Sequence, residues 1–140
     1  MLNPVAVAFA AGSAGGLATV FTLWLFVLLG ITAGFGVELQ SPMRADLYRM
    51  VVWGGIFGFL FLLPVMRGSV WQRGLIFGLA PSAVQCLIVF PYALGAGMLG
   101  MGLGELTPVF VLIFNTVWGL VTAYLFVNAG GDTAAAGSHA

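Results

Sequence analysis

Few side chains in this sequence could carry acid–base, metal or nucleophilic chemistry. The 140 residues include four Asp or Glu, one His and one Cys. His139 lies in a polar tail and Cys86 lies in an apolar run, so His-based metal sites and Cys–His or Ser–His pairs are excluded. Bis-His haem ligation within the apolar part and CxxC motifs are excluded for the same reason. The sequence predicts no enzyme, no catalytic residue, no metal and no cofactor.

Two carboxylates support a functional hypothesis because each closes a Gly-rich stretch. Glu38 is the second-last residue of GITAGFGVEL and Glu105 is the second-last residue of GMLGMGLGEL. Paired carboxylates at one mouth of a helical bundle can share a proton or gather a cation. Alternatively, both are interfacial, and Glu105 complements the positive N-terminal dipole of the helix that follows it. The two interpretations stay open.

Polar side chains within apolar stretches form a second group of candidates. Gln85 and Asn115 lie near the middle of the third and fourth apolar stretches, and Thr116 follows Asn115. Polar groups at membrane depth face protein or water and find a partner. A hydrogen bond between Asn115 and Gln85 across two helices is one hypothesis. A small polar path lined by Gln85, Asn115 and Thr116 is the other.

Residues 95–100, GAGMLG, match the dinucleotide-binding pattern G-x-G-x-x-G. That motif works after a strand and at the start of a helix, with an acidic residue about 20 positions further on. Here the run follows an apolar helical stretch, and no carboxylate occurs between Glu105 and Asp132. The pattern therefore predicts no dinucleotide site.

Composition places these residues in a membrane. Apolar residues make up 61% of the chain and charged residues 6%, against about 25% charged residues in a soluble domain. A net charge of zero and the absence of a basic cluster argue against nucleic acid. The lipid bilayer is the predicted partner. Four stretches are long enough to span it, at about 4–35, 47–66, 72–94 and 106–128.

The fold class predicted is an all-α, polytopic membrane protein with four transmembrane helices. Residues 1–128 form one transmembrane domain, and residues 129–140 form a disordered polar tail. The two Gly-rich exits match at an offset of 67, and 51–62 matches 112–125 at an offset of 61. We therefore expect two tandem parallel two-helix repeats, at about 4–66 and 72–128.

Glycines four residues apart predict close helix packing, because small residues let helix backbones approach each other in lipid. Trp53 and Trp118 are expected to pack inside against glycines, whereas Tyr48, Trp71 and Tyr92 suit interface anchors. The glycines expected to pack helices are Gly12, Gly16, Gly54, Gly58, Gly74, Gly78 and Gly119, with Asn115 completing the spacing in the fourth helix.

The stretch 71–95 resembles the YagU-like bacterial inner-membrane proteins, which carry W-Q-x-G-L-x-x-G and a later F-P before a glycine. The matching residues are Trp71, Gln72, Gly74, Leu75, Gly78, Phe90 and Pro91. The resemblance covers one helix, and the long soluble insertion of that family is missing. It implies a bacterial inner (plasma) membrane. Arg44 and Arg49 balance Arg67 and Arg73 across the links, and the compact RGSVWQR link favours cytoplasmic termini.

Two functions from different classes fit these observations. The first is a small integral membrane protein that acts as an oligomerising bundle or as an accessory subunit of a membrane complex. Its protein partners would be itself, as a homo-oligomer, or larger membrane subunits. The alternative is a small oligomeric channel or transporter unit for an ion or small solute. The transport function requires Gln85 and Asn115 to face water.

Overall fold

The computed structural model describes residues 3–65 and 68–133, and every regular element in these ranges is helical. The elements are α1 (Pro4–Leu28), α2 (Ile31–Gly34), α3 (Arg44–Gly58), η1 (Phe59–Leu62), α4 (Val70–Val84), the π-helix η2 (Gln85–Ala93), η3 (Met98–Leu103) and α5 (Thr107–Asn128). The described residues contain four helices long and apolar enough to cross a membrane: α1, α3 with η1, α4 with η2, and α5. The prediction of an all-helical chain with four candidate spans is confirmed.

Local sequence signals explain where the helices begin and end. The side chain of Asn3 accepts a hydrogen bond from Val5 N at 2.9 Å and caps α1. Gly30 adopts a left-handed φ of 72°, which ends α1 and divides the first predicted stretch into α1 and α2. Asp46 accepts from Met43 N at 3.0 Å, so α3 begins three residues before its predicted start. Pro108 lies in the first turn of α5, where a missing N–H costs nothing.

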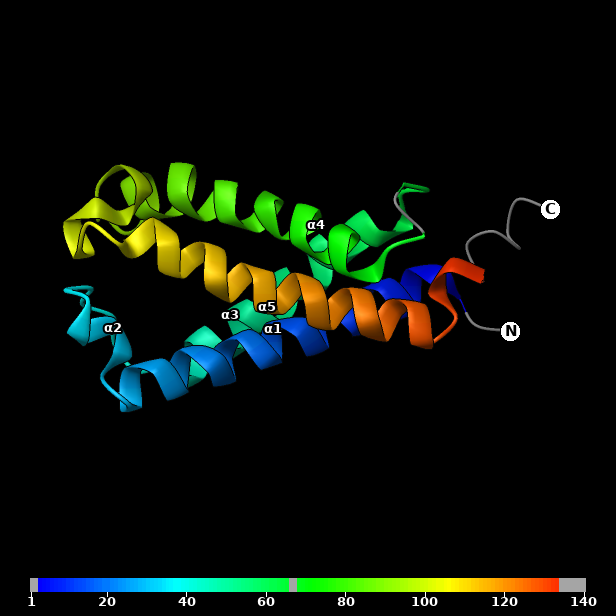
Figure 1. Cartoon of the computed structure of the whole chain (residues 1–140), viewed down its shortest axis with the longest axis horizontal. Helices are drawn as coiled ribbons and strands as arrows, with labels where there is room; N and C mark the ends of the chain where they lie inside the picture. Colours follow the sequence, from blue (N-terminus) through cyan, green and yellow to red (C-terminus); the bar gives the residue numbers. More distant parts are fainter. Residues whose placement is uncertain (1–2, 66–67, 134–140) are drawn as a thin grey trace.

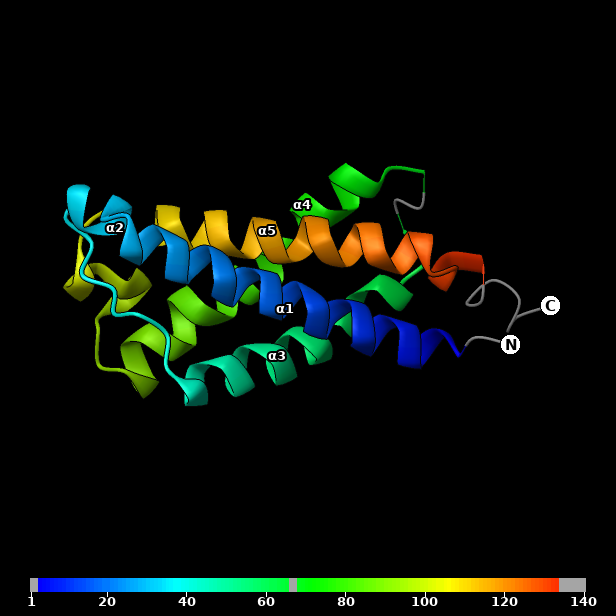
Figure 2. The same ribbon diagram turned by 90° about the horizontal axis from the view of Figure 1, so that it is seen from below.

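The four long helices form an elongated bundle with two distinct ends (Figure 1). The terminal end holds the start of α1, the start of α4 and the end of α5. The loop end holds α2, η3 and the start of α3. α1 packs against both α3 and α5, and α4 packs against α5. Figure 2 shows α4 passing behind α5 and then behind α1 as it runs towards the loop end.

Glycines lie where helix backbones meet. A Cβ atom added to Gly12 would lie 2.8 Å from the Cα of Gly58 and closer still to the carbonyl oxygen of Gly54, so α1 and α3 touch backbone to backbone. Between α4 and α5, which form a second helical hairpin after that of α1 and α3, a Cβ on Gly74 would lie 2.8 Å from Gly119 O. The other predicted packing glycines, Gly16 and Gly78, meet the backbones of Met50 and Asn115 in the same way. The glycine faces are therefore in contact within one chain.

Replacing Gly12 with alanine is expected to lower the free energy of unfolding by about 1–3 kcal/mol, because the added methyl group overlaps fixed backbone atoms of α3. Unfolding in detergent micelles by a denaturing detergent would measure this loss. Gly34→Ala is the matched control, because that helical glycine has open space around it. An equal loss for both variants would contradict the close approach of α1 and α3.

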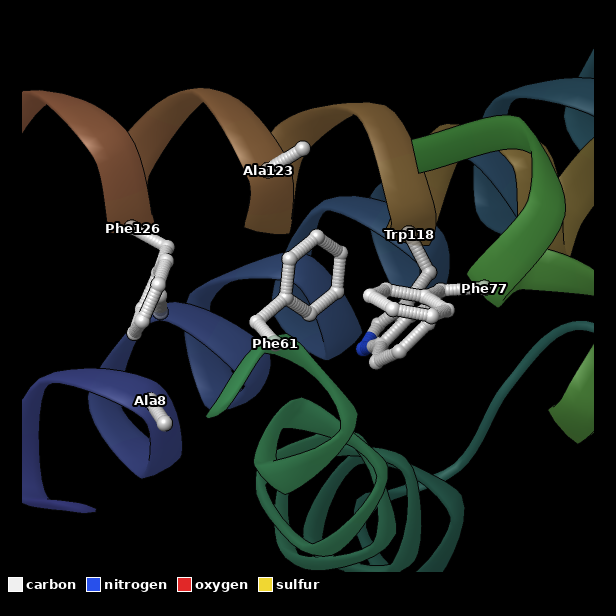
Figure 3. Packing of buried hydrophobic residues seen from close by; sticks show 7 residues of the cluster. Ala8, Phe61, Phe77, Trp118, Ala123 and Phe126 are labelled. Carbon is white, nitrogen blue, oxygen red and sulfur yellow. The ribbon is translucent and has the colours of Figure 1, made fainter. Parts of the chain in front are cut away.

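An aromatic cluster fills the terminal half of the bundle (Figure 3). The ring of Phe61 lies 4.8 Å from that of Phe77 and 6.0 Å from those of Trp118 and Phe126. Trp118 is 3% exposed. Its Nε1 lies 3.1 Å from Gly12 O and 3.3 Å from Gly54 O, so one indole donor joins α5 to both α1 and α3. Trp53, by contrast, is 53% exposed, so the prediction that it packs inside was wrong.

Arg73 is fully buried at the terminal end. Its Nη1 lies 2.8 and 2.9 Å from the two carboxylate oxygens of Asp132. Nη2 donates to the carbonyl oxygens of Phe61 and Leu63. The guanidinium lies over the rings of Phe61, Phe77 and Phe126 at 5.2 to 5.8 Å from their centroids. This arginine, which the sequence suggested for a polar link, is instead part of the core.

The ion pair also changes where the folded part of the chain ends. The sequence suggested a disordered tail over 129–140. In the structure, Gly131 packs against the ring of Phe126 and Asp132 binds Arg73. The remaining tail residues, 134–140, lie outside the described residues.

Candidate functional site in a lateral groove

A groove of about 560 Å³ opens between α3 and α4. In the part of the chain that the structure describes, these two helices make hardly any backbone contact with each other. Trp53 and Phe57 of α3 form one wall, Pro81 and Ile88 form the opposite wall, and Phe114 lies on the floor. The volume falls in the range of small-molecule sites.

The shape of the α4 wall follows from its sequence. Pro81 lies inside α4 and lacks the N–H that would bond to the carbonyl of Phe77. The helix then continues as a π-helix from Gln85 to Ala93, with Pro91 inside it. Prolines and π-helical segments are recognised causes of helix bending, and π-helical segments are frequent at functional sites. The irregular part of this span therefore coincides with the groove.

The floor of the groove carries a pair of amides. Asn115 Nδ2 donates to Gln85 Oε1 at 3.2 Å and to Val111 O at 3.0 Å. Asn115 is 8% exposed, and both amides line the groove. Thr19 of α1 lies beside them and donates to Gly15 O at 2.9 Å. Three polar side chains from three helices thus converge on the same floor.

A double-mutant cycle on Asn115→Leu and Gln85→Leu is expected to give a coupling of about 0.6 kcal/mol, the average for hydrogen bonds between membrane helices. The free energy of unfolding in micelles would be measured for both single variants and for the double variant. Thr116→Val paired with Gln85→Leu provides the control cycle, because the structure gives these two residues no hydrogen bond. Purely additive losses in the first cycle would argue against the bond.

The loop end of the groove is polar. Gln40, Asp46 and Arg49 form its rim. Asp46 Oδ1 lies 3.6 Å from Arg49 Nη2, and the Arg49 side chain is 61% exposed. An exposed ion pair of this kind adds little stability. The groove therefore runs from a charged rim, between apolar walls, to a buried pair of amides.

Of the five polar residues that the sequence singled out, two meet in the groove and three lie outside it. Gln85 and Asn115 meet on the groove floor. Thr116 does not line the groove and faces α4, where its Cα lies 3.6 Å from a Cβ built on Gly78. Glu38 and Glu105 are both exposed at the loop end, and neither lines the groove.

The two Gly-rich exits contact each other at the loop end. Glu38 N donates to Leu103 O at 2.9 Å. A Cβ on Gly104 would lie 2.9 Å from the Cα of Val37, so the backbones of these two segments touch there without side chains between them. Gly104 has a φ of 150°, and Gly95, Gly97 and Gly100 have left-handed φ values. The glycines of GAGMLG thus serve backbone turns between α4 and α5.

Other groove residues carried no signal in the sequence. Trp53 and Phe57 read as ordinary apolar residues of a span, and Thr19 is an isolated hydroxyl in α1. They come together because α3 and α4 separate while α1 and α5 stay packed. Only a prediction of which helices touch could have identified them.

Comparisons of the chain with protein-family models, with curated proteins and with solved structures found no match.

Proposed function

We propose that the protein is a non-catalytic integral membrane protein that serves as an accessory component of a membrane. In this role it holds a membrane-resident molecule in the groove between α3 and α4. The observation that carries this proposal is a groove that is open sideways and has buried amides on its floor. The other long-helix contacts are closed by glycine packing and by Trp118.

The proposed environment is a bacterial inner membrane with both termini in the cytoplasm. Four candidate spans support a membrane location, and so do the exposed apolar side chains on every long helix, which include Phe21, Ile56, Leu79 and Leu112. The resemblance of 71–95 to YagU-like proteins stays a prediction.

We also propose that the chain is a tandem repeat of two helical hairpins. Corresponding glycines support this proposal. Gly12 of α1 contacts Gly58 of α3, and Gly74 of α4 contacts Gly119 of α5. The hairpins differ in their outer contacts, because α1 packs against α5 whereas α3 leaves α4. The groove lies where that symmetry is broken.

If the protein associates with itself, we propose that it does so through surfaces other than the glycine faces. These faces motivated the prediction of a homo-oligomer, yet their neighbours in the structure belong to the same chain. A protein partner would therefore meet the lipid-facing side chains. Large lipid-facing side chains keep two helix backbones further apart than glycines do, so such an interface packs less closely.

The transport alternative makes an opposite prediction for Asn115. A water-filled path would let a membrane-impermeant maleimide label Asn115→Cys in a Cys86→Ala background. We expect no labelling from either side, because the groove opens towards lipid. Glu38→Cys, at an exposed position of the loop end, is the positive control. Rapid labelling at Asn115→Cys would favour transport over the accessory function.

Photo-cross-linking in native membranes tests the proposed function. A benzophenone amino acid at Ile88, which lines the groove, is compared with the same group at Leu112, an exposed residue of α5 outside the groove. We expect mass spectrometry to find a discrete adduct at position 88 and only bulk phospholipid at position 112. Bulk phospholipid at both positions would overturn the proposal.

A further inference from the structure

We infer that the groove binds a neutral, largely apolar molecule carrying one hydroxyl group, which is held between Asn115 and Gln85. This inference rests on the proposed function, because it names the chemistry of the molecule in the groove. It is carried by the hydrogen-bonding atoms of the two amides and by the apolar walls on either side of them.

The hydrogen bonds of Asn115 fix the orientation of both amides. Asn115 Nδ2 donates to Val111 O at 3.0 Å, so the nitrogen of this amide lies on the Val111 side. The same nitrogen donates to Gln85 Oε1, so the atom that Gln85 presents to this nitrogen is its oxygen and not its own nitrogen. The assignment of oxygen and nitrogen in the pair therefore follows from a backbone carbonyl, whose identity is certain.

This orientation leaves one acceptor and one donor on the groove floor. Within residues 3–65 and 68–133, Asn115 Oδ1 accepts no hydrogen bond and Gln85 Nε2 donates none. Neither atom is sealed inside the protein, and both side chains line the groove. In lipid, a polar group without a partner is costly, so a ligand that satisfies both atoms gains more than one that satisfies neither.

A hydroxyl group matches this floor because it donates and accepts at once. It would donate to Asn115 Oδ1 and accept from Gln85 Nε2. A simple hydrocarbon would leave both amide atoms unsatisfied. A carboxylate or an ammonium group would bring a charge to a floor that offers no counter-charge, since the charged residues that line the groove, Asp46 and Arg49, lie on its rim.

The rest of the groove favours an apolar body. Its walls are aromatic and aliphatic, as in Trp53, Phe57 and Ile88. About 560 Å³ is enough for a molecule of small-ligand size. The side opening allows such a molecule to enter from the lipid phase.

Tryptophan quenching provides the test. Trp53 and Trp118 line the groove, and Trp24→Phe with Trp71→Phe removes the other two indoles. The probes are ω-bromohexanol and bromohexane, which differ only in the hydroxyl group. Protein in vesicles is titrated with each probe, and quenching is expressed per mole fraction of probe in the bilayer. We expect the alcohol to quench at an about 5- to 10-fold lower mole fraction, as one to two hydrogen bonds would give.

Matched variants locate the effect on the two amides. Asn115→Leu and Gln85→Leu should each reduce the preference for the alcohol to about 2-fold or less. Thr116→Val, on the same helix but outside the groove, should retain the full preference. If Asn115→Leu does not fold, Gln85→Leu alone decides, because its side chain is only partly buried.

The outcomes separate this inference from the proposed function. Equal quenching by both probes in the parent protein overturns the hydroxyl specificity, as does a preference that survives in both leucine variants. A discrete cross-linked adduct at position 88 would then still support the accessory function with a ligand of other chemistry. A specific quenching by the alcohol without any native adduct would overturn only the proposed function.

Discussion

Replacing Asp132 with alanine is expected to lower the free energy of unfolding by about 3–5 kcal/mol, because it leaves the guanidinium of Arg73 buried without its counter-charge. The carbonyls of Phe61 and Leu63 and three aromatic rings would remain around the charge, but none of them neutralises it. Unfolding in micelles would measure the loss. Arg49→Ala, which removes an exposed ion pair at the other end of the bundle and leaves the hydrogen bond from Met43 N to Asp46 in place, should change stability by less than about 1 kcal/mol.

A double variant separates the burial of charge from general damage to the terminal end. Arg73→Met combined with Asp132→Leu removes both charges and keeps an apolar side chain among the rings. Buried pairs replaced in this way are often no less stable than the original. We expect this variant to recover most of the loss. A double variant as unstable as Asp132→Ala would mean that packing, rather than the unpaired charge, dominates.

Trp118→Ala is expected to cost about 3–5 kcal/mol, because it empties the centre of the aromatic cluster. It also removes the indole donor that lies between the carbonyls of Gly12 and Gly54. Loss of this side chain would therefore loosen the contact of α5 with both helices of the first hairpin. The free energy of unfolding, measured as for Asp132, reports the effect.

Two further variants divide the contribution of Trp118. Trp118→Phe keeps most of the ring and removes the donor, so it should cost about 1 kcal/mol from the hydrogen bond, plus a smaller packing loss. Trp71→Ala, at an exposed position of α4, should cost little. If Trp118→Phe were as damaging as Trp118→Ala, the hydrogen bond would be the main contribution of the side chain.

The sequence predicted the helices well because their limits depend on local chemistry. Apolar length predicted the four candidate spans, and the fourth begins within one residue of its predicted start at about 106. The first, predicted to run to about residue 35, is divided at Gly30. The predicted pairing of Asn115 with Gln85 appears on the groove floor because a polar side chain among apolar helices has few other partners. These features need no knowledge of how distant helices cross.

Features that depend on helix crossing could not be predicted in the same way. Arg73 and Asp132 are distant in sequence, and each lies in a segment that has the composition of an ordinary polar link or tail. Trp53 and Trp118 look alike in the sequence, yet α5 turns one into the core while α3 leaves the other on the groove wall. The π-helix after Pro81 has no pattern of its own, since its residues are as apolar as those of a regular span.

The Arg73–Asp132 pair also sets an order of assembly. Asp132 follows Arg73 by 59 residues, so a ribosome completes the third candidate span long before it supplies the counter-charge. Until then Arg73, in the first turn of α4, can extend its long side chain past the end of the helix towards water. The aromatic cluster around Phe61 can close over the guanidinium only after α5 has entered. The terminal end of the bundle can therefore be completed only after the fourth candidate span and Asp132 have been synthesised.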